Sequence, residues 1–592
     1  MKALRYVRIT VAVAVFALMC AQFLDIYHAL PKPYYRYDVV ATQFVPSLLK
    51  WLATGAVVSG AAFITFCVCA LLFGRAYCAS FCAFGLLMDV IRRPFFYLCS
   101  RKFLAKSKLG KFAKKCSTMK FKKARNVLKS CMIAIAAICI IFGWIALLGL
   151  IDPYALYGKT MGAVVHPVVA TLCDATSAML SSVGLYVIDP VNGNPQVPLA
   201  AFAFGLIVLV GISAASILRG RLFCNTLCPV GALLGFLSKF ALFNLSIDKG
   251  KCVSCGMCER ACKSECADAK GKKIDFSKCV LCFNCAANCP KKAISYTLND
   301  KYKRIFKAEP APATHMESAI DSAKLSCRGS ALERKISRRK FPAIFAGISA
   351  LFISGAKTDA QERKRYRGGE GAGKGCAGKG KNCAEISPYR LAGHRDDKRL
   401  TTPPGSKSIE NFLDNCIACQ RCTAACKAQI LKPSLGQWGL SHFMQPYMDY
   451  DQGFCLFDCH NCSKVCPTGA INFVNLKQKR KIKLGTAVFN EDLCIVKTDG
   501  TDCAACGEHC PVQAIEMVPF GKKSDSLYIP HVHASVCIGC GACESICPVR
   551  PHRAIVVQGL SVHAQAKEFQ TSMRVNKPKY DEPATSNSPF PF

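Results

Sequence analysis

The sequence has no dinucleotide-binding glycine fingerprint between a predicted strand and a predicted helix, and no segment suggests a P-loop. Direct nicotinamide or ATP chemistry is therefore not expected. Acidic residues are scarce, with 38 Asp and Glu against 77 Lys and Arg, so the formal net charge is +39. The basic residues concentrate beside apolar segments, as between Arg92 and Arg125, which favours membrane topology over nucleic-acid binding.

Cysteine is abundant, with 40 in a chain of 592 residues. Most of these cysteines fall in C-x-x-C groups, which indicates metal binding rather than a disulfide scaffold. A [4Fe-4S] cluster needs four converging thiolates, and three of them can come from one loop with two-residue gaps. Repeated sets of this kind predict about six [4Fe-4S] clusters in the chain.

The first two sets have the spacing of bacterial two-cluster ferredoxins, in which the fourth cysteine of each motif ligates the other cluster. The two predicted ligand sets are Cys252, Cys255, Cys258 and Cys289, and Cys279, Cys282, Cys285 and Cys262. Zinc ribbons are the alternative, but they use two pairs rather than two quartets ending in Cys-Pro. Lys263 stands where the first motif has proline, and an extra cysteine, Cys266, follows it.

Four more sets lie near the C-terminus, and three of them end in Cys-Pro. They are Cys416, Cys419, Cys422 and Cys426; Cys455, Cys459, Cys462 and Cys466; Cys494, Cys503, Cys506 and Cys510; and Cys537, Cys540, Cys543 and Cys547. Cys494 is the least secure ligand, because an eight-residue gap follows it. Apolar segments at 470–473, 514–517 and 554–557 predict short strands that cover the clusters.

Four apolar stretches are long enough to cross a bilayer as helices, which takes about 20 residues. They are Ile9 to Tyr27, Ala53 to Phe73, Lys129 to Leu150 and Pro198 to Leu218. The first has no clear cleavage site and is interpreted as an uncleaved anchor. Basic residues such as Arg219 and Arg221 place both ends of this module in the cytoplasm. The segment from Met161 to Val187 is a further candidate for an embedded or interfacial helix.

The second and fourth stretches end in the same motif, G-R-x-[YF]-C-x-x-x-C. The predicted topology puts both copies on the cytoplasmic side, where four cysteines could form an additional metal or redox site: Cys78, Cys82, Cys224 and Cys228. Ordinary buried packing cysteines are the alternative. Other membrane cysteines are in no such repeat and are interpreted as packing residues: Cys20, Cys67, Cys69, Cys131 and Cys139.

These membrane motifs, followed by the paired ferredoxin motifs, resemble the NapH family of membrane ferredoxins, relatives of NosR and CcoG, over about residues 1 to 300. One departure is Ala83, where the family pattern has proline. The stretch from Thr402 through the four sets to Val557 resembles the NapG-type four-cluster ferredoxins. The resemblance implies a fusion of two partners that pass electrons between the quinol pool and a periplasmic acceptor. It also implies that sets one and four of the second module exchange their last cysteines, as do sets two and three.

The expected fold is an α-helical membrane bundle of four or five transmembrane helices with small α+β ferredoxin-like modules. The predicted parts are a membrane domain (1–245), a two-cluster module (246–300), a linker (301–340), a fifth helix or twin-arginine-type segment (341–356), a second linker (357–410), a four-cluster module (411–560) and a loose tail (561–592). Ser337 to Phe341 resembles a twin-arginine export signal, which would carry the second module across the membrane. The basic run from Arg363 to Arg367 argues against that export.

Together these features predict a multi-pass polyferredoxin of the inner membrane. We expect it to transfer electrons between quinol or quinone and a redox partner protein, such as a cytochrome or a reductase, with the second module in the periplasm. Two alternatives remain open. One is a CcoG-like metal reductase in which Cys224 and Cys228 hold or reduce copper, and the other is a non-catalytic maturation or redox-sensing subunit.

Overall fold

The computed structural model describes residues 2–25, 27, 42–100, 106–117, 119–122, 124–186, 197–299, 302, 400–520 and 527–575. Its contacts divide the chain into two units, one made of Met1–Asp300 with Pro388–Phe592 and the other of Lys301–Ser387. All the helices and strands with described bounds lie in the first unit. Apart from residue 302, the predicted linker at 301–340 and the apolar segment at 341–356 lie outside the described residues.

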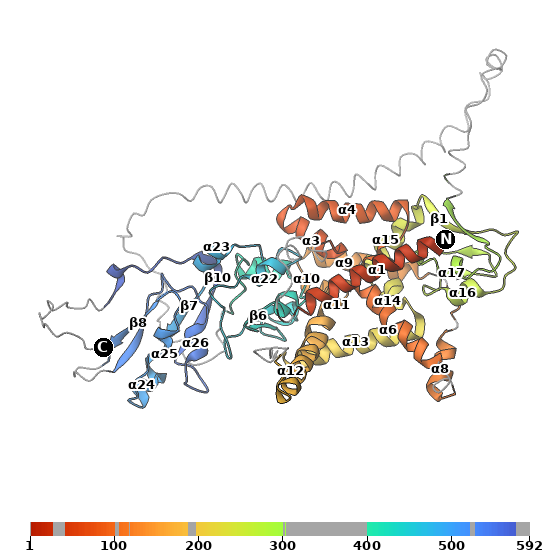
Figure 1. Cartoon of the computed structure of the whole chain (residues 1–592). Coiled ribbons are helices and arrows are strands. Elements are labelled where there is room, and N and C mark those ends of the chain that lie inside the picture. The colour runs from red at the N-terminus through yellow and green to blue at the C-terminus, as the bar shows by residue number, and fades with distance from the viewer. Residues whose placement is uncertain are drawn as a thin grey trace, which may run out of the picture. The chain divides into compact units, whose positions relative to one another are not determined.

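The N-terminal part of the first unit is helical and rich in apolar residues (Figure 1). Its longer helices are α1 (Lys2–Phe23), α3 (Phe44–Thr54), α4 (Val57–Leu72), α6 (Ala83–Ser100), α8 (Lys108–Ser117), α9 (Asn126–Ile141), α12 (His166–Ser182) and α13 (Leu199–Arg219). Shorter helices connect them: α5 (Tyr77–Ser80), α10 (Ile145–Leu148), α11 (Pro153–Thr160), the π-helix η1 (Met161–Val165), α14 (Leu222–Thr226), α15 (Pro229–Leu237) and the 3-10 turn η2 (Ser238–Phe240).

Among the residues that the structure describes, three helices are long and apolar enough to cross a membrane: Ala3–Phe23, Pro153–Ser182 and Leu199–Arg219. The first and last of these helices agree with the predicted stretches at 9–27 and 198–218. The middle one consists of α11, η1 and α12 and contains most of the candidate embedded segment at 161–187. The predicted stretches at 53–73 and 129–150 instead contain α4 and α9, each 16 residues and therefore about 24 Å long. The predicted count of four spans is thus not confirmed.

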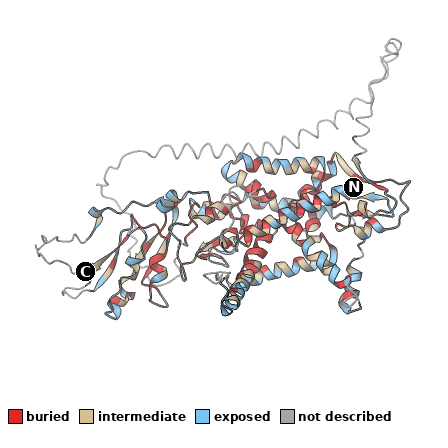
Figure 2. Cartoon of the chain, in the orientation of Figure 1, coloured by how far each residue is buried: buried red, intermediate tan, exposed pale blue. Residues whose placement is uncertain are grey.

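Large apolar side chains are exposed along several of these helices. Val57 of α4 is 80% exposed, Ile141 of α9 is 69% exposed and Leu199 of α13 is 82% exposed. Figure 2 shows exposed residues along α4 and α13, with the buried residues gathered between the helices. Many large apolar side chains exposed on neighbouring helices indicate contact with a partner or a membrane. Together with the three long apolar helices, it indicates a membrane protein.

The first ferredoxin module follows α15 and has little apolar core apart from its cysteines. Its elements are β1 (Phe243–Ile247), α16 (Met257–Ala261), β2 (Ala267–Asp268), β3 (Lys273–Ile274), α17 (Asn284–Ala287) and β4 (Ile294–Leu298). Strands β1 and β4 pair antiparallel in the register Phe243 to Leu298, and β2 pairs with β3. The predicted module at 246–300 is therefore three residues too short at its start.

The second module consists of two halves, each with its own core around cysteines. The first half contains α20 (Ile409–Asn415), α21 (Arg421–Ala424), β5 (Leu431–Pro433), η5 (Leu440–His442), β6 (Pro446–Met448) and α22 (Asn461–Val465). After α23 (Leu476–Lys481), the rest comprises β7 (Ile482–Phe489), η6 (Glu491–Leu493), α24 (Ile495–Thr498), α25 (Ala505–Glu508), β8 (Ile515–Pro519), β9 (Tyr528–Val532), α26 (Ala542–Ile546), β10 (Ile555–Gln565) and η7 (Thr571–Met573). Antiparallel pairs join β5 to β6, β7 to β10 and β8 to β9.

The second module extends beyond the predicted range 411–560 at both ends. Thr401 forms an antiparallel bridge with Met448, and Ser406 is fully buried, so the predicted linker at 357–410 ends before residue 400. Strand β10 continues to Gln565 because it pairs with β7, so the predicted tail at 561–592 begins too early. Strands form after the third and fourth cysteine sets as predicted, whereas residues 470–473 form none.

The second module packs on the helices through its first cysteine loop. Glycines face this loop, because a Cβ atom at Gly149 would overlap the carbonyl of Ile417 and one at Gly158 would overlap that of Cys419. A Cβ at Gly162 would lie 2.9 Å from Cβ of Gln420. Gly158 and Gly162 share a helix face at a spacing of four residues, and small residues there allow close approach.

Helix α13 contacts both ferredoxin modules. Near its start, the ring of Phe204 lies edge-on to Phe443 of the second module, with centroids 5.3 Å apart. Just after its end, the backbone N–H of Arg221 donates to the carbonyl of Lys263 in the first module at 3.0 Å. The 17 residues between these contacts correspond to roughly 25 Å of helix. The two modules therefore pack at opposite ends of this helix.

Replacing Gly158 by leucine should displace the loop around Cys419, because the new side chain cannot share space with the Cys419 carbonyl. Hydrogen-deuterium exchange should then rise in residues 416–422. The matched control is Gly211→Leu in α13, where nothing lies within 4 Å of the added Cβ. Equal exchange in the two variants would contradict the packing of this loop on α11.

Candidate iron-sulfur centres

The structure brings the cysteines of the first module together in the predicted combination. Cys252, Cys255, Cys258 and Cys289 line one cavity, so the fourth cysteine comes from the second motif. Cys285 lies close enough to Cys262, Cys279 and Cys282 to interact with each electrostatically. Cys262 thus joins the other set, as two-cluster ferredoxin spacing predicts.

In the second module each half mixes the cysteines of two neighbouring sets. Three cavities are each lined by four cysteines: Cys416, Cys419, Cys422 and Cys466; Cys494, Cys503, Cys506 and Cys547; and Cys537, Cys540, Cys543 and Cys510. Cys426 lies near Cys455 and Cys459, and Cys462 lies near all three. Sets one and two therefore exchange their last cysteines, as do sets three and four.

This pairing corrects the exchange that the resemblance implied, between sets one and four and between sets two and three. The physical reason is that each half folds around its own core, which contains cysteines of adjacent sets only. Cys494 does reach its cavity, because the inserted residues after it form the short helix α24 instead of displacing it.

The loops around the first cysteines share an unusual backbone conformation. In four sets, the residues just before and just after the second cysteine have positive φ: Ser254 and Gly256, Leu281 and Phe283, Ala418 and Gln420, and Gly539 and Gly541. This conformation costs roughly 1 to 2 kcal/mol for each non-glycine residue. It curls the chain so that successive N–H groups point inward, which is the anion-binding arrangement common at iron-sulfur sites.

The last cysteines of the motifs accept backbone hydrogen bonds. The N–H of Ala293 donates to Sγ of Cys289 at 3.3 Å, and the N–H of Ala514 donates to Sγ of Cys510 at 3.2 Å. The N–H of Cys266 donates to Sγ of Cys262 at 3.4 Å, so Cys262 behaves like the other last cysteines although Lys263 replaces proline. Such bonds stabilise thiolates and tune cluster potentials.

These quartets fit a cluster better than a single ion. Within the residues the structure describes, no three His, Cys, Asp or Glu side chains come close enough to hold one metal ion. A [4Fe-4S] cluster separates its four thiolates more widely than one tetrahedral ion does. When bound, the cluster supplies one-electron chemistry, and the protein supplies its thiolates, its burial and its hydrogen bonds.

The two membrane motifs bring Cys78, Cys82, Cys224 and Cys228 into the core of the helices, and each is at most 5% exposed. The pKa of Cys228 is raised, first by burial and then by Cys224, Cys82 and Cys78, so all four thiols are neighbours. Cys139, a cysteine outside the repeats, packs in the same core as predicted for a structural residue.

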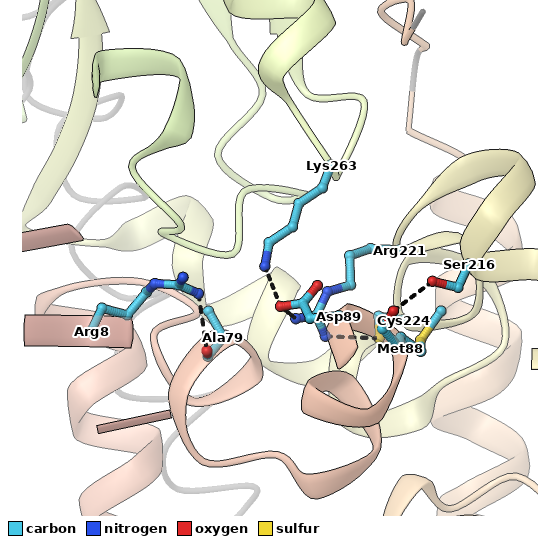
Figure 3. Close-up of polar contacts among 8 residues, drawn as sticks. All are labelled: Arg8, Ala79, Met88, Asp89, Ser216, Arg221, Cys224 and Lys263. Carbon is cyan, nitrogen blue, oxygen red and sulfur yellow. Dashed lines mark hydrogen bonds and ion pairs between the residues drawn. The ribbon is translucent and has the colours of Figure 1, made fainter. Parts of the chain in front are cut away.

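Asp89 of α6 links the helices to the first ferredoxin module (Figure 3). Its carboxylate Oδ2 lies 2.8 Å from Nη2 of Arg221 and 2.5 Å from Nζ of Lys263. Burial alone would raise the pKa of Asp89, but Arg221 and Lys263 together hold it below its ordinary value. The carboxylate is therefore charged at neutral pH. Sequence reasoning noted Lys263 only as a departure from proline and missed Asp89, since no motif connects residues 174 positions apart.

Two domain families match the chain. The 4Fe-4S binding domain matches residues 56–106 and 201–248, each of which contains one membrane CxxxC motif, and the 4Fe-4S dicluster domain matches residues 501–550. No solved structure matches the chain.

Curated relatives are ferredoxin-type proteins. The methylamine utilization ferredoxin-type protein MauM of Paracoccus denitrificans is 32% identical over 166 residues, which cover 27% of this chain and 72% of MauM. The ferredoxin-type protein NapG of Escherichia coli is 30% identical over 167 residues, 27% of this chain and 71% of NapG. NapF of the same species is 27% identical over 161 residues, 27% of this chain and 86% of NapF. The chain belongs to the ferredoxin-type 4Fe-4S electron-transfer proteins related to MauM, NapG and NapF. The relation to NapH, NosR and CcoG stays a prediction.

The ligand pairing can be tested by counting iron in two quadruple variants. Removing Cys416, Cys419, Cys422 and Cys466 should eliminate one cluster, or about 4 iron atoms. Removing Cys416, Cys419, Cys422 and Cys547 should damage two clusters and lose about 8. Iron and sulfide analysis of anaerobically purified protein distinguishes the two pairings. A loss of about 4 from the second variant and about 8 from the first would contradict the pairing.

Asp89→Asn should loosen the first module, because it leaves Arg221 and Lys263 without their shared counter-ion. Breaking a buried pair in this way costs about 3 kcal/mol or more. The temperature at which cluster absorbance is lost should therefore fall. Asp248→Asn is the control, because the Asp248–Lys251 pair is exposed and such pairs contribute little. Equal loss temperatures in the two variants would rule out Asp89 as a link.

Proposed function

We propose that the chain conducts electrons across a membrane, between the quinol pool on one side and a redox partner protein on the other. The single observation that carries this proposal is the continuous core of the helices. That core includes Cys282 of the first ferredoxin module and Cys419 of the second module. Two ferredoxin modules at opposite ends of α13 are the arrangement that a transmembrane electron path needs.

The packing also suggests an order for the clusters of the second module. The set with Cys419 is nearest the helices, since its loop packs on α11. The set with Cys455 shares its half of the module. The backbone N–H of Cys455 donates to the carbonyl of Cys540 at 2.9 Å, which joins the two halves. The cluster of Cys494, Cys503, Cys506 and Cys547 is then farthest along the path and the candidate contact for a partner.

The distribution of basic residues supports an orientation. Arg219 and Arg221 lie at the end of α13 that contacts the first module, and basic residues mark the cytoplasmic side. The second module would then lie in the periplasm. The chain must in that case cross the membrane between residues 299 and 400, where the apolar run Phe341 to Ala356 with its twin-arginine-like flank is the candidate segment.

Buried ionisable residues also lie in the helices next to the first cysteine loop of the second module. Asp152 and Lys159 are fully buried and His166 is 3% exposed, and these residues flank or follow the π-helix η1. Ionisable residues in membrane segments are functional candidates by default, and π-helical turns are frequent at functional sites.

A topology reporter fused after Phe592 tests the orientation. We expect alkaline phosphatase at this position to be active, because it folds only outside the cytoplasm. A reporter inserted after Asn299, at the end of β4, should give the opposite result. Two cytoplasmic reporters would contradict the proposal.

A further inference from the structure

One buried cysteine of the first module is in neither of its two ligand sets. Cys266 is 3% exposed and follows Cys262, the last cysteine of its motif, by four residues. The N–H of Cys266 donates to Sγ of Cys262, and the N–H of Ala293 makes the equivalent bond in its own set. What distinguishes Cys266 is therefore its thiol group. In three other sets a buried alanine stands at this position: Ala293, Ala470 and Ala514.

The thiol group of Cys266 contacts two cysteines of one ligand set. Its Sγ atom lies 3.4 Å from Sγ of Cys262, and its side chain also hydrogen-bonds that of Cys279. Both partners belong to the set with Cys282 and Cys285. A cysteine that binds iron is a thiolate, which has no proton to donate. Cys266 is therefore the donor in both contacts, and its one S–H hydrogen has two thiolate acceptors within reach.

The helical part of the chain fixes the position of Cys266. Each of the three carbonyls that precede this cysteine accepts a hydrogen bond from that part. The carbonyl of Cys266 itself accepts from the N–H of Asp275 at 2.8 Å. With every carbonyl from 263 to 266 bound, the loop holds the thiol group against the two ligands. The three bonds to the helical part are N–H of Arg221 to Lys263 at 3.0 Å, Nδ2 of Asn225 to Ser264 at 3.3 Å and N–H of Lys122 to Glu265 at 3.3 Å.

The ligand set beside Cys266 is more buried than the other set of the same module. All four of its cysteines are buried, whereas Cys255 of the other set is exposed and Cys252 and Cys289 are partly exposed. Reduction adds a negative charge to a cluster, and burial away from water disfavours that charge. A hydrogen bond to a ligand sulfur favours the reduced form, as water does. The thiol group of Cys266 thus takes the place of solvent at the buried set, whose Cys282 belongs to the core of the helices.

We propose that Cys266 is a positioning residue that raises the reduction potential of the cluster held by Cys262, Cys279, Cys282 and Cys285. It acts through the thiolates of Cys262 and Cys279 and does not bind iron itself. One electron passes between this cluster and the neighbouring cluster of the module. No bond forms or breaks, and the S–H proton stays on Cys266. The use of this electron in transfer across a membrane rests on the proposed function, whereas the effect on the potential does not.

A redox titration of the full chain, purified anaerobically and followed by electron paramagnetic resonance, tests the role of Cys266. Cys266→Ala should move the midpoint of one cluster signal to lower potential and leave the iron content unchanged. Cys266→Ser keeps a hydrogen-bond donor, so it should return that midpoint toward its value in the natural chain. The matched control is Cys139→Ala, which removes a buried thiol from the core of the helices and should leave every midpoint in place.

Infrared difference spectra, reduced minus oxidised, give a second measurement that does not need the alanine variant to fold. In the natural chain an S–H stretching band should move to lower frequency on reduction, because the hydrogen bond strengthens as the cluster gains charge. The band should be missing from the spectrum of Cys266→Ser. The same spectrum in both proteins would overturn the inference.

Three results of the titration would also overturn it. They are unchanged midpoints in Cys266→Ala, equal shifts in the alanine and serine variants, and the loss of one cluster's iron from Cys266→Ala, which would make Cys266 a ligand. The proposed function fails separately. If the midpoint falls as expected but the natural chain moves no electrons across a membrane, the role of Cys266 stands and transmembrane transfer does not.

Discussion

Compensation of buried thiolate charge is the constraint on which the whole structure depends. A cluster with its thiolates is anionic, and an anion placed away from water is costly unless donors or cations surround it. The ferredoxin loops meet this need with backbone, because positive φ at Ser254, Leu281 and Ala418 turns N–H groups toward the sulfurs. In the core of the helices, the buried arginines Arg75 and Arg221 lie beside Cys78 and Cys224.

The same charges hold the parts of the molecule together. Arg221 faces Cys224 on one side and Asp89 on the other, and Asp89 in turn binds Lys263 of the first module. At the opposite end the fully buried Lys159 faces Cys416 and Cys419. Charged side chains that lie beside cysteines therefore also hold the modules on the helices.

The cysteine sets could be predicted from the sequence, because cluster ligation imposes spacing within a few residues. It located the apolar helices at 3–23 and 199–219 closely, since their hydrophobic runs are continuous. It was wrong on the exchange between sets of the second module, because which cysteines meet depends on the two separate cores and not on spacing. The contact of Asp89 with Lys263 and the close approach of Arg75 to Gly231 could not be foreseen, since both join segments far apart in the chain.

The central claim is that electrons pass through this chain from one side of a membrane to the other. Proteoliposomes that carry the protein, with a membrane-impermeant reductant outside and an impermeant acceptor trapped inside, test it most directly. The account predicts that the trapped acceptor is reduced. Reduction no faster than in protein-free liposomes would contradict it.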